Sequence, residues 1–130
     1  MKVALTVWDG RISPVFDVCR EALVLDIDHG DIVATAKMDL DTASPLQRIE
    51  RLVDRGVEKL ICGAISEDVH AEAAPRGLKV IGFVAGEIEE VVQAFVSGGL
   101  PSPKLSMPGC RGRRRRVRGG WSGGRGRGRG

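Results

Sequence analysis

The chain has 130 residues, of which 42% are apolar, and this is enough for the core of one domain. No run approaches the roughly 18 apolar residues of a membrane-spanning helix, and the first residues lack a secretory signal pattern, so we expect a cytoplasmic protein without a membrane partner. Ten of the 20 basic residues and none of the 17 acidic ones fall in 101–130, so residues 1–100 carry about −7 and residues 101–130 about +10.

The first predicted element is a strand at residues 2–8. Its almost continuous apolar run is typical of a central strand buried on both faces. Two further apolar runs, 22–28 and 32–38, flank the short turn at 29–31, and this pattern predicts a β-hairpin. A helix then begins after Ser44, which is followed by a proline and by Gln47 in the pattern of a capping box.

The second half of the chain alternates between strands and helices. Strands are predicted at 57–62 and 78–83. A short helix is predicted to begin at Ser66, and a further helix is predicted at 86–97. Such alternation implies parallel strands joined by right-handed crossovers. The order β-ββ-αβαβα therefore predicts an α/β fold in three layers, a five-stranded mixed sheet flanked by helices, in a ribonuclease-H-like arrangement. In this arrangement the first and fourth strands are neighbours.

From Pro101 the periodic pattern ends, and almost every residue after position 109 is Arg or Gly. Such a composition cannot bury enough apolar surface to offset chain entropy, which predicts a disordered basic tail at 101–130 after a domain at 1–100. Arginine–glycine segments bind single-stranded nucleic acid through phosphates, with stacking from groups such as Trp121. The alternatives are a solubilising tail or one that contacts the acidic body.

The loop at 9–19 and the strand end at Cys62 are the candidate site. Ligands of open α/β sheets bind where parallel strands end, and thiolates from Cys19 and Cys62 could hold a soft metal or a metal–sulfur cluster. The alternative for both cysteines is a packed core residue. Arg11 and Arg20 could neutralise an anionic ligand to which Ser13 hydrogen-bonds, or they could be solvated surface residues.

The residue pattern argues against the common catalytic sites. Ribonuclease-H-type chemistry needs clustered carboxylates that hold two metal ions. Here the first strand has no acid before Asp9, and the fourth ends in Cys62. The sequence has no phosphate-binding glycine fingerprint and no Ser/His/Asp or Cys/His arrangement. The three cysteines are odd in number and widely spaced, which suits a reducing compartment rather than a disulfide framework.

Three segments resemble the dinitrogenase iron–molybdenum cofactor biosynthesis family, the NifX-like domain that is also found at the C-terminus of NifB. They are Gly10-Arg11-Ile12-Ser13-Pro14-x-Phe16, Leu60-Ile61-Cys62-Gly63-Ala64-Ile65-Ser66 and Gly86-Glu87-Ile88-Glu89-Glu90-Val91. The likeness covers about residues 1–100, and Met107-Pro108-Gly109-Cys110 is similar to the ending of one branch. Many members have a histidine after the Ser-Pro pair, where this chain has Val15.

The resemblance implies a ribonuclease-H-like fold that binds an iron–molybdenum cofactor or a related metal–sulfur cluster, without enzymatic activity. We therefore expect an accessory protein of metallocluster assembly, whose partner is a cluster donor or acceptor. The thiolate candidates are Cys19, Cys62 and Cys110, and the other candidate contacts are Gly10, Arg11, Ser13, Phe16, Gly63 and Ser66. The alternative is a module that binds nucleic acid or an acidic partner through the Arg/Gly tail.

Overall fold

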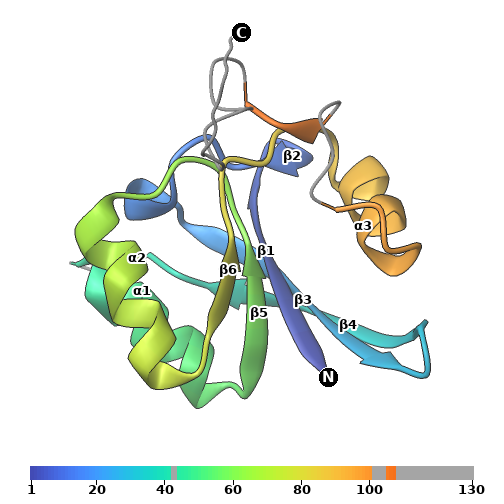
Figure 1. Ribbon diagram of the computed structural model, residues 1–130, viewed down its shortest axis with the longest axis horizontal. Helices are drawn as coiled ribbons and strands as arrows, with labels where there is room; N and C mark the ends of the chain where they lie inside the picture. The colour runs from blue at the N-terminus through green and yellow to red at the C-terminus, as the bar shows by residue number, and fades with distance from the viewer. Residues whose placement is uncertain (42–43, 101–104, 108–130) are drawn as a thin grey trace, which may run out of the picture.

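Strand β1 (Lys2–Trp8) lies at the centre of a mixed sheet with the order β4-β3-β1-β5-β6 (Figure 1). The computed structural model describes residues 1–41, 44–100 and 105–107. β3 (Glu21–Asp28) and β4 (Asp31–Asp39) form the predicted hairpin, and β3 is antiparallel to β1. β5 (Val57–Ile61) and β6 (Lys79–Ile81) run parallel to it. The mixed α/β sheet and the pairing of the first and fourth predicted strands are thus confirmed, while the ribonuclease-H-like name stays a prediction.

A sixth strand in the described part of the chain, β2 (Arg11–Ile12), was not predicted. It pairs with the end of β1 across a two-residue turn at Asp9 and Gly10, whose φ angles are 53° and 75°. Two left-handed residues form the turn that joins twisted antiparallel strands, and Asp-Gly is a preferred sequence for it. The predicted loop at 9–19 therefore begins as a small hairpin.

Helices cover both faces of the sheet. α1 (Pro45–Asp54) and α2 (Glu67–Ala73) lie on one face, and α3 (Ile88–Val96) lies on the other (Figure 1). Because strand side chains alternate between faces, Ala4 packs under α1 and α2 while Val3 and Leu5 pack under α3. The hydroxyl of Ser44 accepts a hydrogen bond from the amide of Gln47 at 3.1 Å, as the predicted helix cap requires.

The prediction of a central strand buried on both faces is confirmed for the middle of β1, but the two end residues, Lys2 and Trp8, are exposed. Residues Val3–Thr6 are fully buried, but Trp8 is 62% exposed. The apolar run continues past the point where helices cover the sheet, so its last aromatic residue lies on the surface. Two short 3-10 helices, η1 (Phe16–Val18) and η2 (Ala74–Arg76), complete the regular structure of the described residues.

Residues 105–107 pair with residues 83–85, although the composition predicts disorder from residue 101 onward. The amide of Ala85 donates to the carbonyl of Leu105 at 2.7 Å, and the amide of Met107 donates to the carbonyl of Phe83 at 2.8 Å. These three residues belong to the packed part of the chain. The remainder of the predicted tail, with Cys110 and Trp121, lies outside the described residues. Within the described ranges, no helix has the length and apolar character needed to cross a membrane.

Candidate functional site

The loop that follows β2 is fixed to the end of β5. The amide of Phe16 donates to the carbonyl of Ala64 at 2.7 Å, and the amide of Ala64 donates to the carbonyl of Pro14 at 2.8 Å. Val15 and Ala64 thereby form a parallel β-bridge. The loop and the segment after Cys62 are adjacent, as the predicted strand order requires, because β1 and β5 are neighbours in the sheet.

Gly63 makes this close approach possible. A Cβ atom at position 63 would lie 2.5 Å from the carbonyl oxygen of Pro14 and 2.8 Å from its carbonyl carbon, and it would also clash with the carbonyl oxygen of Ser13. All three contacts are with backbone, which cannot rotate away as a side chain can. Only glycine at position 63 lets the loop lie against the strand end in this position.

Arg48, on α1, holds the next part of the loop. Its Nε donates to the carbonyl of Cys19 at 2.7 Å, and a terminal nitrogen donates to the carbonyl of Asp17 at 2.9 Å. The side chain is 5% exposed, and no ion pair between described residues includes it. The Asp17 carboxylate accepts a hydrogen bond from the amide of Ser66 at 3.3 Å and so links the loop to the start of α2. Three separate contacts therefore fix the shape of this loop.

Between the loop and the end of β1 lies a cavity of about 330 Å³, here called the loop hollow. Trp8 and Val18 are 62% and 68% exposed, and together with Val15 they give the rim an apolar character. Arg20 is exposed and takes part in no ion pair among the described residues. The lining residues are Val7, Trp8, Ser13, Pro14, Val15, Val18, Cys19 and Arg20. An apolar surface with one free cation suits an anionic, polarisable ligand.

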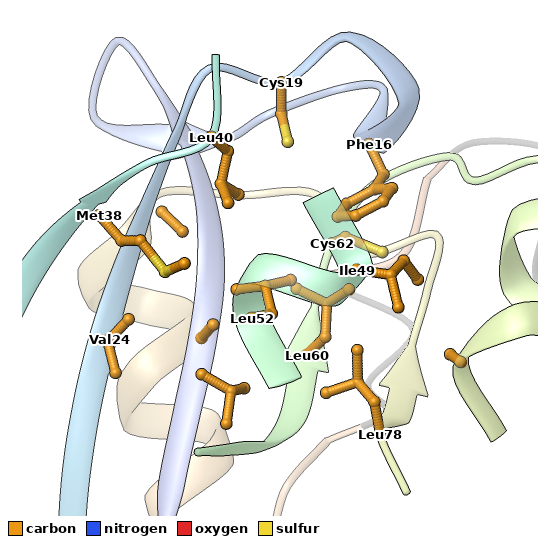
Figure 2. Packing of buried hydrophobic residues seen from close by; sticks show 14 of the residues in the cluster. Phe16, Cys19, Val24, Met38, Leu40, Ile49, Leu52, Leu60, Cys62 and Leu78 are labelled. Carbon is orange, nitrogen blue, oxygen red and sulfur yellow. The ribbon is translucent and has the colours of Figure 1, made fainter. Parts of the chain in front are cut away.

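The two described cysteines lie in the core. Cys19 is 3% exposed and Cys62 is fully buried, and Figure 2 shows both among the apolar side chains that surround Phe16 and Leu40. Burial raises the pKa of Cys19 to about 11, although the Arg48 guanidinium opposes the shift, and burial raises the pKa of Cys62 to about 12. Both groups are therefore thiols near neutral pH. Of the two, only Cys19 lines the loop hollow.

The predicted site residues occupy different positions around this hollow. Ser13 and Cys19 line it, whereas Phe16 and Cys62 are core residues that do not. Gly10 forms the turn before β2, and its carbonyl accepts from the amide of Ile88 at the start of α3 at 3.0 Å. The other four predicted residues lie elsewhere. Arg11 is exposed in β2, Gly63 lies beneath the loop, and Ser66 immediately precedes α2, while Cys110 is outside the described residues.

No group of three or more His, Cys, Asp or Glu side chains within the described ranges could hold a metal ion. A metal centre ligated by this part of the chain alone therefore has no support. A preformed cluster, which carries its own sulfide ligands, makes fewer demands on the protein.

The sequence pattern does not identify two residues of the site. The apolar run predicts a buried strand that includes Trp8, whereas the Asp-Gly pair that follows is a signal that the strand ends there. Arg48 lies beside the apolar stripe of a helix, and nothing in the sequence pattern distinguishes it from a solvated arginine.

The family model described as dinitrogenase iron-molybdenum cofactor matches residues 1–98. The crystal structure of a protein named PH0822 superposes with a TM-score of 0.74 at 20% identity, over 85% of this chain and 96% of that one. The apo form of the orange protein from Desulfovibrio gigas gives a TM-score of 0.65 at 20% identity, over 81% of this chain and 94% of that one. A candidate NifB protein from Thermotoga gives a TM-score of 0.60 at 22% identity, over 75% of this chain and 89% of that one. No curated protein sequence matches significantly.

Proposed function

The chain belongs to the dinitrogenase iron–molybdenum cofactor family, and from this premise we propose that it binds a metal–sulfur cluster as cargo in the loop hollow. The protein would be a non-enzymatic carrier in the cytoplasm that takes an iron–molybdenum or related cluster from a donor protein and delivers it to an acceptor. The observation that carries the proposal is the composition of this hollow, which lies between the end of the central strand and the loop that follows it. It has an apolar rim, one arginine without an ion pair among the described residues (Arg20) and one cysteine (Cys19).

The chemistry of the lining supports an anionic cluster better than a bare metal ion. Metal–sulfur clusters are polarisable, and contacts with Trp8, Val15 and Val18 would remove their surface from water. Arg20 would supply the opposite charge.

Cys19 is the described residue best placed to bond directly to such a cargo. Cys19 lines the hollow, but the residue is 3% exposed and its side chain packs in the core beneath the loop, so the loop would have to shift for the sulfur to reach the cargo. A metal that binds a thiol removes its proton, and this offsets the raised pKa. Cys62 would contribute by packing rather than by ligation, since it lies outside the wall of the hollow.

The test is anaerobic reconstitution of the full chain with iron, molybdate and sulfide, followed by metal analysis and visible absorption. We expect the unaltered protein to retain a coloured cluster. Arg20→Met and Cys19→Ala should each reduce the metal content, while the matched variant Cys62→Ala should keep it after circular dichroism has shown that all variants are folded. A colourless, metal-free wild type would refute the proposal. Loss of metal only in Cys62→Ala would refute the proposed location.

Binding of nucleic acid or an acidic partner through the Arg/Gly tail remains the alternative prediction. Its residues, 109–130, lie outside the described part of the chain. No feature of the described residues favours it over cluster binding.

A further inference from the structure

A second hollow lies at the opposite end of the sheet from the loop hollow. It has a volume of about 420 Å³ and is here called the lysine hollow. It lies where β5 and β6 begin and α3 ends, so the helix leaves part of this sheet face open. Ile27, Ile81, Phe95 and Leu100 supply apolar surface, and Lys59 and Lys79 supply charge. This size and this mixture of many apolar groups with few polar ones are typical of small-molecule sites.

The two lysines place two positive charges on the same face of the sheet. They are direct partners on the neighbouring parallel strands β5 and β6, so their side chains leave the same face of the sheet. No acidic residue lines the hollow, and neither lysine takes part in an ion pair within the described ranges.

Lys59 is held in a defined position. Its Nζ lies 5.6 Å from the centroid of the Phe95 ring, a cation–π contact between two residues that line the hollow. The C-terminal end of α3, close to Phe95, offers only the partial negative charge of a helix dipole. A full negative charge placed between the two lysines would attract both ammonium groups.

We propose that the lysine hollow binds an amphipathic carboxylate, with the carboxylate between Lys59 and Lys79 and an alkyl chain against Ile27, Ile81 and Phe95. The carboxylate would accept charge-assisted hydrogen bonds from both ammonium groups. Burial of the chain would remove the exposed parts of the apolar lining from water. The chain's own Arg/Gly tail does not suit this site, because residues 101–130 carry ten basic residues and no acidic one.

The experiment is a calorimetric titration of the full chain with decanoate below its micelle-forming concentration. Decanol, which has the same chain length and no charge, is the control ligand. We expect decanoate to bind and added salt to weaken it. The variant Lys59→Met/Lys79→Met, which keeps the length and apolar stems of both side chains, should bind about tenfold more weakly or worse. Lys37→Met, an exposed lysine on β4, should bind as the wild type does.

Four results would overturn the proposal. The first is no binding of decanoate to the wild type. The second is equal binding of decanoate and decanol, and the third is equal affinity in the wild type and Lys59→Met/Lys79→Met; either would show that the lysines do not recognise the charge. The fourth comes from a parallel titration with phosphatidylglycerol vesicles: binding to the vesicles without binding to monomeric decanoate would identify a membrane contact instead. These results do not depend on cluster binding at the loop hollow, and neither proposal depends on the other.

Discussion

Gly63→Ala is the substitution that most directly tests how the loop hollow is built. The added methyl would lie 2.5 Å from the carbonyl oxygen of Pro14, so the loop at 13–16 must move away from β5. This movement weakens the hydrogen bonds of 2.7 and 2.8 Å that join Phe16 and Pro14 to Ala64. The perturbation therefore acts on the attachment of the loop without removing any functional side chain.

The expected loss of stability follows from two contributions. Each of the two hydrogen bonds contributes about 1 kcal/mol net, and overpacking against backbone costs about 1–3 kcal/mol. We therefore expect the free energy of unfolding to fall by about 4 kcal/mol, a large part of the roughly 5–15 kcal/mol that stabilises a typical domain. Unfolding in guanidinium chloride, followed by circular dichroism, measures this change as a lower midpoint.

Gly82→Ala is the matched control. Its Cβ would lie 3.4 Å from the Cγ2 of Ile65, an ordinary contact with a side chain, and the position does not have a positive φ. The control should change stability by less than about 1 kcal/mol. If Gly63→Ala proves as stable as Gly82→Ala, the loop is not held against β5 in the way described, and the geometry of the loop hollow would need revision.

Two further predictions concern the buried groups beneath the loop. Arg48→Met removes two charge-assisted hydrogen bonds to loop carbonyls and should lower the free energy of unfolding by about 3 kcal/mol; Arg48→Lys should recover part of the loss in the same denaturation assay, and a change below about 1 kcal/mol for Arg48→Met would contradict the assigned role. The buried thiols should make stability depend on pH in the alkaline range. The folded pKa values of Cys19 and Cys62, about 11 and 12, exceed the ordinary value of 9.0, so the folded state keeps these protons longer than the unfolded chain does. Their contribution is complete below about pH 9 and is lost as the pH rises toward about 11 and 12, by about 3 kcal/mol for Cys19 alone. Urea unfolding at a series of alkaline pH values should therefore show a steeper decline for the wild type than for Cys19→Ala/Cys62→Ala, and parallel declines would exclude the effect.

The main features of the fold were predictable because they depend on local patterns. The apolar runs, the turn at 29–31 and the Ser44 cap are short-range signals, and they located the hairpin and the first helix close to their observed positions. The alternation of strands and helices then determined which strands are parallel, since right-handed crossovers leave few alternatives. The predicted proximity of the loop at 9–19 to the segment after Cys62 followed from that order.

The roles of individual side chains were decided only by tertiary contacts. Trp8 is exposed at the end of β1, and Cys62 is buried in a cluster with Phe16 of the loop and Ile49 of α1. The pairing of Lys59 with Lys79 depends on the register of two strands that are 20 positions apart in the sequence. A sequence pattern shows which residues are able to be buried or to bind, because periodicity and turn chemistry are local. Which of them meet is set by the packing of segments that are distant in the sequence, and only the folded structure determines that.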